Sequence, residues 1–497
     1  MHQLVVQQNP WWVTGLPALA ADKQLAAAVG AAVSWQPPMH LLDLTQDGVY
    51  TLRGQRQVGK STYLKLVVKY LLEQGWAPRR ILYADVEAAN ATRQGQLQKL
   101  IKDYLDDSAS HVTPGERRVV LLDEVTGIKN WQTAIRVLAD AGALVGVTVL
   151  ATGSNCKDVK TGGDRLPRRR GNVLGRDLLY QPLSFRDYLA VTEPAVAHAL
   201  PTLDIADAFV PERLHAAAQD ARHHDAVIAA RFHRYLATGG FLASINEEVA
   251  HQGVIPEYVY RDYRAAVLGE VARLGRRESN LRAIVGWLRG KLGQAFEWRT
   301  MAQEAQIARH ETAQDLVEDV ESAYVWHLLY RTKTVDAAAP TFKSPKRLYP
   351  LDPFTWHMLD AWSRNVPTGW EATQLTLGDP DRMGALAEAV AVDHVRRLFG
   401  PHCYYYRSDT DEEIDLVATR AGATVLRAEV KYRNKIDGKD QAALRRHGGG
   451  VLLSKHSWHF APGRPGDDAA TRGPVVELPI PHALALWPCP SVFAAVE

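Results

Sequence analysis

The run Gly54-Gln55-Arg56-Gln57-Val58-Gly59-Lys60-Ser61-Thr62 constrains the fold of this chain more than any other segment, because it fits the pattern G-x-x-x-x-G-K-[ST]. An apolar run at residues 48–52 precedes it directly, and apolar residues recur at helical spacing through residues 63–70. The order of apolar run, glycine loop and helix predicts a strand-loop-helix unit. The sequence therefore favours an α/β fold.

The residue types of this loop suit a phosphate group. The backbone N–H groups of residues 54–61 can curl around a β-phosphate only if the glycines adopt conformations that are closed to residues with side chains. The helix that begins near Lys60 adds its positive end. Lys60 would then supply charge to the β- and γ-phosphates, and the Ser61 hydroxyl is the expected Mg²⁺ ligand. The motif therefore predicts ATP and Mg²⁺ as cofactors. The alternative is a glycine-containing turn that fits the pattern by chance.

Two later apolar runs end in polar residues. Residues 118–122 end in Asp123 and Glu124, as expected of a buried parallel strand whose carboxyl end faces a nucleotide. Asp123 would hold Mg²⁺ through water, and Glu124 would polarise the attacking water. Residues 147–152 end shortly before Ser154, whose hydroxyl could contact the γ-phosphate. A solvated turn is the alternative for the acidic pair.

Four segments carry a family resemblance: RGQRQVGKSTYLK, VVLLDEVTGIKNWQTAIRVLAD, VLATGSN and LLYQPLSFRDYL. Together they resemble the archaeal-type AAA+ ATPases of archaea and bacteria, whose C-terminal region often carries a nuclease-like domain. The resemblance implies an ATPase core followed by a helical lid. From the positions of these motifs we expect a lead-in at residues 1–40 and an AAA+ α/β ATPase core at 41–194, and helical apolar spacing predicts the lid at 195–265. Within the lid, residues 235–241 resemble the turn that approaches the nucleotide.

The same resemblance implies self-association into a ring or another homo-oligomer. In such ATPases an arginine of one subunit completes the neighbour's site. This chain offers Arg168, Arg169, Arg170 and Arg176, and Arg176 is the preferred finger because it lies closest to the strand expected at residues 178–180. A solvated basic loop, or one that contacts DNA phosphates, is the alternative.

Residues 266–335 predict a winged-helix domain. Helices are expected at 280–292, 301–305 and 312–320, followed by a wing strand at 324–331. The third helix is acidic and therefore a poor surface for phosphates, which favours a structural or protein-contacting domain. Any phosphate contacts would come from the basic residues Arg273, Arg276, Arg277, Arg282, Arg289 and Lys291.

A second candidate site lies in the C-terminal third. Glu388 falls in an expected helix, Asp415 in one strand, and Glu429 and Lys431 on one face of the next strand. Asp415 and Glu429 could share a Mg²⁺ ion that polarises a phosphate, while Lys431 positions or deprotonates the attacking water. This is the layout that metal-assisted phosphodiester hydrolysis requires.

The pattern resembles the PD-(D/E)XK nuclease superfamily, with Ile414 where the superfamily's name has proline. The resemblance implies a PD-(D/E)XK-like α/β domain at residues 336–497. Two alternatives remain open: an exposed hairpin with charged faces, and a nuclease fold that binds DNA or protein without cutting.

Composition adds little to these motifs. The net charge of +2 means that a nucleic-acid partner would need local basic patches. Cys156, Cys403 and Cys489 are isolated, which argues for a reduced, cytoplasmic setting without structural zinc. No apolar run reaches membrane-spanning length, and the first residues lack a signal-peptide pattern, so no membrane partner is expected.

The first functional hypothesis is an AAA+ ATPase that acts on branched or duplex DNA and whose nucleotide cycle drives or gates the nuclease-like module. The alternative is a nucleotide-dependent regulatory switch in defence or toxin control, whose C-terminal domain contacts proteins and does not cleave. Salt-dependent DNA binding distinguishes the two hypotheses.

Overall fold

The chain divides into two compact units in the computed structural model. The model describes residues 3–113, 115–153, 176–364, 366–410, 412–462 and 473–495, together with Val159, Asp164 and Leu166. The first unit comprises Met1–Gln181 and Ser491–Ala495, and Pro182–Pro490 belongs to the second. The chain therefore enters the second unit at Pro182, before the predicted core boundary at residue 194, and returns to the first unit near its end.

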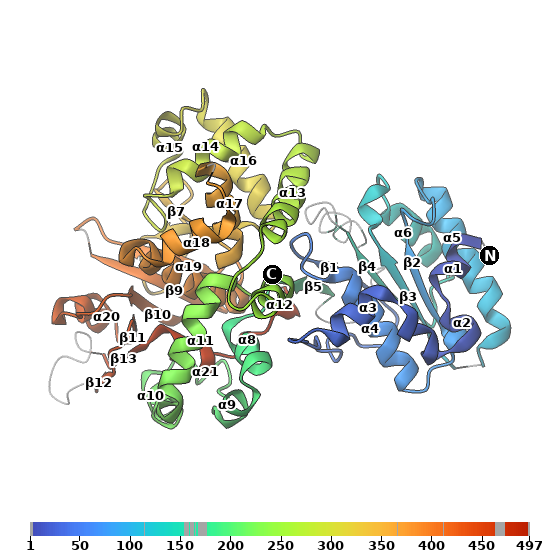
Figure 1. The fold of residues 1–497 in the computed structure, drawn as a ribbon, viewed down its shortest axis with the longest axis horizontal. Coiled ribbons are helices and arrows are strands. Elements are labelled where there is room, and N and C mark those ends of the chain that lie inside the picture. Colours follow the sequence, from blue (N-terminus) through green and yellow to red (C-terminus); the bar gives the residue numbers. More distant parts are fainter. Residues whose placement is uncertain are drawn as a thin grey trace. The chain divides into compact units, whose positions relative to one another are not determined.

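A six-stranded sheet forms the centre of the first unit, in the order β14-β5-β1-β4-β3-β2 (Figure 1). Its strands are β1 (Gly48–Arg53), β2 (Ile81–Asp85), β3 (Arg118–Asp123), β4 (Val147–Thr152), β5 (Asp177–Tyr180) and β14 (Val492–Ala494). The strands β1 to β5 run parallel, and β14 pairs with β5 in the antiparallel direction. Every residue of β1 and β4 is buried, as parallel strands covered on both faces require.

The described helices of the first unit are α1 (Gln3–Gln8), α2 (Trp11–Thr14), α3 (Lys23–Gly30), α4 (Lys60–Glu73), α5 (Gln94–Ser108) and α6 (Gln132–Asp140). Helix α4 begins inside the glycine motif. Its buried residues Leu64, Val67, Val68 and Leu71 recur at helical spacing and form one apolar face. The predicted strand, loop and helix are thus confirmed.

The N-terminal segment covers β2, which lies at the sheet edge. The Asn9 side chain accepts a hydrogen bond from Tyr83 N (2.8 Å) and donates one to Tyr83 O (2.7 Å). Gln8 makes the same two contacts with Asp85, at 2.8 and 3.2 Å. These side-chain amides replace a neighbouring strand and satisfy edge groups that could otherwise pair with another chain. The predicted lead-in is therefore an integral part of the first unit.

An eight-stranded sheet forms the second unit, in the order β12-β13-β11-β10-β9-β8-β6-β7 (Figure 1). Its strands are β6 (Trp326–Thr332), β7 (Lys346–Pro350), β8 (Cys403–Arg407), β9 (Glu413–Arg420), β10 (Ala423–Lys431), β11 (Gly450–Ser454), β12 (His459–Ala461) and β13 (Val475–Pro479). The predicted hairpin forms between β9 and β10, and its turn residues Ala421 and Gly422 have φ values of 50° and 80°.

The described helices of the second unit are α8 (Phe185–Thr192), α9 (Pro194–Ala199), α10 (Pro211–Ala221), α11 (Asp225–Thr238), α12 (Leu242–Ala250), α13 (Glu257–Arg273), α14 (Glu278–Leu288), α15 (Trp298–Glu304), α16 (His310–Ser322), α17 (Pro353–Arg364), α18 (Gly369–Leu377), α19 (Pro380–Phe399), α20 (Ala442–Arg446) and α21 (Ile480–Leu486). The segments predicted as lid, winged-helix and nuclease-like domains lie in this one unit, except for Ser491–Ala495, which belongs to the first unit.

The turn between α11 and α12, expected to approach a nucleotide, is packed inside the second unit. Gly240 N donates to Asp352 Oδ2 (2.7 Å), and Gly240 O accepts from Leu183 N (2.8 Å). A Cβ atom on Gly240 would overlap the Leu183 backbone, and one on Gly239 would overlap the Asp352 carboxylate. These glycines therefore serve a close internal contact.

The predicted helices of residues 266–335 form as α14, α15 and α16, but the strand that follows differs from an isolated wing. β6 pairs with β7 in the antiparallel direction and with β8 in parallel, so it belongs to the main sheet. A further antiparallel bridge joins Phe296, between α14 and α15, to Lys346 of β7.

Most of the basic residues expected to contact phosphates have partners within this unit. Arg276 binds Asp319 (2.7 Å) and Asp315 (3.3 Å), both on α16. The remaining contacts are Arg273 with Glu270, Arg289 with Asp360, Lys291 with Glu304, and Arg282 with the carbonyl oxygen of Trp362. The positive charge of this region is thus largely compensated internally.

Cys403 and Cys489 are free and buried, and Cys156 lies outside the described residues. Within the described ranges, no helix has both the length and the apolar character needed to span a membrane.

Candidate nucleotide site and carboxylate cluster

The glycine loop follows β1 and is shaped by its contact with β5. A Cβ atom on Gly54 would overlap the carbonyl oxygen of Tyr180, and Gly59 has a φ of 114°. The buried Lys60 ammonium donates to the carbonyl oxygens of Gly54 (2.9 Å) and Gln55 (3.0 Å). The loop therefore holds a positive charge against its own backbone, beside the start of α4.

Asp123 lies buried at the carboxyl end of β3. The Tyr83 hydroxyl donates to Asp123 Oδ2 at 3.0 Å. Burial raises the pKa of the Asp123 carboxyl, hydrogen bonds from Ser61 and Tyr83 oppose this rise, and the nearby Glu124 and Asp85 add to it. A divalent cation would relieve both the desolvation and the repulsion, and Ser61 and Asp123 offer the oxygen ligands that Mg²⁺ prefers. These residues fit the predicted ion.

Two of these neighbours were absent from the sequence predictions. Asp85 ends β2 and lies opposite Asp123 in the strand register, while Tyr83 lies two residues earlier. The signal was available, because the apolar run Ile81-Leu82-Tyr83-Ala84 ends in a carboxylate as β3 does.

Glu124 marks a sharp change of direction after β3. Its φ of 56° is left-handed, a conformation that costs a residue with a side chain roughly 1–2 kcal/mol. Two residues later, Thr126 packs so closely on Gly153, at the end of β4, that a Cβ atom there would lie 2.5 Å from Thr126 Cγ2. The acidic turn thus reaches the segment that leads to Ser154, which itself lies outside the described residues.

Of the finger candidates, Arg168, Arg169 and Arg170 lie outside the described residues, and Arg176 directly precedes β5. The carbonyl oxygen of Arg176 accepts from Thr51 N at 2.9 Å. Tyr180, at the other end of β5, contacts the glycine loop. The backbone of Arg176 therefore lies at the end of β5 remote from its own phosphate loop.

The second predicted site does assemble, from helix α19 and strands β9 and β10. Lys431 forms an ion pair with Glu429 and lies 3.5 Å from Asp415 Oδ2. Asp415 Oδ2 also accepts from Val430 N at 2.9 Å, and Asp415 N donates to Glu429 Oε2 at 3.2 Å. Glu388 of α19 is linked to this group through residues of β7. We call Glu388, Asp415, Glu429 and Lys431 the carboxylate cluster.

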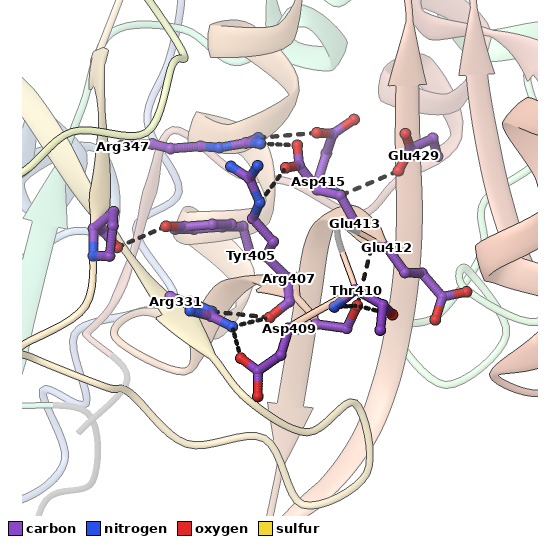
Figure 2. Close-up of polar contacts among 12 residues, drawn as sticks. Arg331, Arg347, Tyr405, Arg407, Asp409, Thr410, Glu412, Glu413, Asp415 and Glu429 are labelled. Carbon is purple, nitrogen blue, oxygen red and sulfur yellow. Dashed lines mark hydrogen bonds and ion pairs between the residues drawn. The ribbon is translucent and has the colours of Figure 1, made fainter.

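Arg347 of β7 occupies the centre of the carboxylate cluster. Its Nη1 atom lies 2.9 Å from Asp415 Oδ1 and 3.6 Å from Glu388 Oε1, and its Nη2 atom pairs with Glu413. Figure 2 shows the guanidinium directed at Asp415 and Glu413. The Tyr349 hydroxyl, also from β7, donates to Glu388 at 2.6 Å.

Sequence reasoning missed Arg347 and Tyr349. The available signal is the alternation in Lys346-Arg347-Leu348-Tyr349, which places Arg347 and Tyr349 on one face of a strand. Nothing local indicates that this face meets Glu388 and Asp415.

The charges of the carboxylate cluster are largely balanced by its own side chains. Burial alone would raise the pKa of Asp415, but Lys431 and Arg347 outweigh burial and lower it. Burial and the negative charge of Asp415 raise the pKa values of Glu388 and Glu429. Asp415 is thus flanked by two cations and by two carboxyls whose pKa values are raised.

The predicted metal ion does not fit the carboxylate cluster in this arrangement. Arg347 and Lys431 already contact the oxygens that Asp415 and Glu429 would offer to a cation. Within the described residues, no group of three or more His, Cys, Asp or Glu side chains is arranged to hold a metal ion. The prediction of a shared Mg²⁺ at Asp415 and Glu429 is therefore not supported.

The glycine loop and Asp123 fall inside a recognised domain. Residues 46–189 match the family model described as an AAA domain. The chain thus contains an AAA domain. Residues 383–455, which include Glu388, Asp415, Glu429 and Lys431, match a domain of unknown function, DUF4143. No curated protein matches the chain.

Solved structures that resemble the chain include proteins of Aeropyrum pernix. Its ORC2 protein in ADPNP-ADP complexes is 13% identical, with 74% of this chain and 94% of that chain covered and a TM-score of 0.34. Its ORC1 protein in complex with DNA is 12% identical, with 71% and 93% covered and a TM-score of 0.29. These TM-scores are too low for the likeness to bear on function.

Proposed function

We propose that this chain is a Mg²⁺-dependent ATPase whose AAA domain hydrolyses ATP and whose second unit is an interaction module that does not cleave DNA. The observation that carries the first part is the convergence of Lys60, Ser61 and Asp123 beside the glycine loop. The position of Arg347 within the carboxylate cluster supports the second part.

In this proposal the residues of the AAA domain have separate tasks. The loop amides and Lys60 would bind and orient the phosphates, and Ser61 and Asp123 would hold Mg²⁺. The bound ion neutralises charge on the phosphates. Glu124, at the turn after β3, positions and polarises the attacking water. Asp85 strengthens the negative potential that attracts the ion.

We further propose that the winged helix predicted at residues 266–335 extends to β7 and has a structural role. The order of elements is helix α14, the bridge at Phe296, helices α15 and α16, and the hairpin β6–β7. The acidic residues of α16 are engaged within the second unit, because Asp315 and Asp319 bind Arg276 and Glu321 binds Arg396. This helix therefore supports the sheet and is a poor surface for contacts with DNA.

The nuclease-like sheet fits the regulatory alternative better than DNA cleavage. Its carboxylates face Arg347 and Lys431, and the basic residues of the winged helix are mostly paired. Both features lower the affinity for a metal ion and for phosphates. A nucleotide-dependent switch that contacts a macromolecular partner is the function we propose. A homo-oligomer and a cytoplasmic setting belong to the same proposal.

The test compares ATP binding and hydrolysis by the wild type, Lys60→Ala and Glu124→Gln, each with and without Mg²⁺. Lys60→Ala should bind ATP weakly, whereas Glu124→Gln should retain ATP and hydrolyse it roughly 10²-fold more slowly. Unchanged turnover in Glu124→Gln would remove the role given to that residue.

Adding linear, single-stranded or four-way-junction DNA separates the two functional hypotheses. Binding that weakens steeply with salt, together with faster ATP hydrolysis, would favour the DNA-acting ATPase. Absence of both effects supports the switch.

A further inference from the structure

Tyr83 of β2 contacts the carboxylate that we propose as a Mg²⁺ ligand. Its hydroxyl donates to Asp123 Oδ2 at 3.0 Å, and both residues are buried, at 6% and 2% exposure. In the strand register Tyr83 lies opposite Leu121, and Asp85 lies opposite Asp123. Because side chains two residues apart share one face of a strand, the phenol extends along the sheet toward the carboxyl end of β3, where Asp123 lies.

Two hydroxyl groups hold the Asp123 carboxylate, one from Tyr83 and one from Ser61. Ser61 lies in the first turn of α4 and is itself a proposed ion ligand, whereas Tyr83 has no role in the function proposed above. A phenol remains protonated at neutral pH, so Tyr83 is the donor and the carboxylate is the acceptor. Each carboxylate oxygen has two lone pairs, so this bond restrains Asp123 and still leaves acceptor capacity for an ion or for a water bound to it.

Tyr83 is itself held on two sides. Asn9 accepts from Tyr83 N (2.8 Å) and donates to Tyr83 O (2.7 Å), so the N-terminal segment fixes the backbone of this residue. The Lys65 ammonium lies 5.9 Å from the centre of the Tyr83 ring, within reach of a cation–π contact, and pairs with Asp22 at 2.8 Å. The phenol therefore has a fixed position relative to β3, as a group that orients a metal ligand requires.

We propose that Tyr83 is a positioning residue of the Mg²⁺ site, whose hydroxyl holds Asp123 in the orientation that supports ion binding. This inference rests on the proposed function, since it concerns the same ion. Tyr83 acts through Asp123 and does not itself contact the ion. Removing a group that orients a metal ligand typically lowers metal affinity about 10–100-fold. A buried tyrosine hydroxyl also needs a partner for structural reasons alone, so the test must separate the two roles.

The test measures metal binding without hydrolysis. The full-length wild type and Tyr83→Phe are each titrated with Mn²⁺ in the presence of the non-hydrolysable ATP analogue ADPNP, and free Mn²⁺ is followed by electron paramagnetic resonance. Tyr83→Phe keeps the ring and removes only the hydroxyl. It should bind Mn²⁺ about tenfold more weakly than the wild type, and its affinity for ADPNP without metal should stay the same. In turnover it should need about tenfold more Mg²⁺ for half-maximal ATP hydrolysis, with kcat at saturating Mg²⁺ within about twofold of the wild type.

Tyr104→Phe is the matched control. Tyr104 of α5 is a fully buried tyrosine of the same unit whose hydroxyl donates to the carbonyl oxygen of Arg79 at 3.1 Å. Tyr104→Phe should bind Mn²⁺ like the wild type, whatever thermal stability it loses. Equal Mn²⁺ affinity in Tyr83→Phe and the wild type, or equal losses in Tyr83→Phe and Tyr104→Phe, would overturn this inference alone. A wild type that binds no Mn²⁺ with ADPNP would overturn the proposed function and this inference with it.

Discussion

Arg347 Nη1 lies 2.9 Å from Asp415 Oδ1, and both side chains are buried inside the second unit. Breaking a buried ion pair of this kind by removing one partner costs about 3–5 kcal/mol, because the other charge is left without compensation. Arg347 also contacts Glu388 and Glu413, so its guanidinium and the Lys431 ammonium together balance the charge of the carboxylate cluster. Arg347 occupies one of the Asp415 oxygens that a metal ion would need.

Replacement of this guanidinium should create an affinity for divalent ions. Arg347→Met should lower the free energy of unfolding by about 3–5 kcal/mol, and Mg²⁺ or Mn²⁺ should restore part of it by binding the freed carboxylates. Thermal unfolding with and without each ion measures the effect. Arg331→Met, on the neighbouring strand β6, is the matched control and should show no metal-dependent shift. Equal metal effects in the wild type and Arg347→Met would contradict the role of Arg347.

The wild-type protein should not cleave DNA. Incubation of linear, supercoiled and four-way-junction DNA with Mg²⁺ or Mn²⁺, with and without ATP, should leave each substrate intact, because Arg347 and Lys431 hold the carboxylates. Metal-dependent nicking that disappears in both Asp415→Ala and Lys431→Ala, while ATP hydrolysis persists, would establish a nuclease and refute the non-cleaving proposal.

Arg176 should act on a neighbouring subunit. Its backbone lies at the end of β5 remote from its own glycine loop. If the side chain completes the site of a neighbouring subunit, Arg176→Ala should bind ATP normally but hydrolyse it poorly. Mixing Arg176→Ala with Lys60→Ala subunits should restore part of the ATPase activity, since the mixed interface has one complete site. A monomer with full activity would exclude the idea.

Deletion of residues 491–497 should destabilise the AAA domain, although the segment follows the second unit in the chain. Gln181 N donates to Ser491 O (2.9 Å) and Ala495 N to Asp177 O (2.7 Å), so β14 covers the edge of β5. Without it, the contact of Tyr180 with the glycine loop loses its support, and both thermal stability and ATP affinity should fall. Deletion of residues 496–497 alone is the control and should have little effect.

The stability of the second unit should fall in acid because of buried neutral histidines. His394 Nε2 accepts from Phe185 N (2.8 Å) and its Nδ1 lies 2.8 Å from Val390 O, an arrangement that requires the neutral ring. Burial, together with Arg397, lowers the pKa of His394 to about 4, against a partial opposing effect of Asp393.

The lowered pKa of His394 determines the direction in which stability changes with pH. Between about pH 6.5 and pH 4, His394 binds a proton in the unfolded chain but stays neutral in the folded chain. Its contribution to the free energy of unfolding is therefore fully present above this pH range and is lost as the pH falls through it. His394→Gln should reduce the slope of urea-unfolding free energy against pH between 4.5 and 6.5, and leave it unchanged at pH 7 to 8. An identical slope in the variant would show that other groups cause the acid sensitivity.

Local sequence was sufficient to predict how the residues of the candidate nucleotide site are arranged. One strand-loop-helix unit contains Gly54, Gly59, Lys60 and Ser61, so their local spacing is enough to predict it. Asp123 lies at the carboxyl end of a buried parallel strand, which the apolar run before it predicts. The carboxylate cluster was predictable for a similar reason, since strand alternation and a short hairpin bring Glu429 and Lys431 together beside Asp415.

Tertiary structure alone decided what these residues can do. Arg347 approaches Asp415 from 68 positions earlier in the chain, β14 joins the first sheet from the end of the chain, and Gly239 and Gly240 meet Asp352 and Leu183. Each contact joins strands or turns that lie far apart in the sequence. Their pairing depends on the burial of apolar and charged groups across a whole unit, which no local pattern reveals. The chemistry of the carboxylate cluster therefore depends on which distant side chain packs against it.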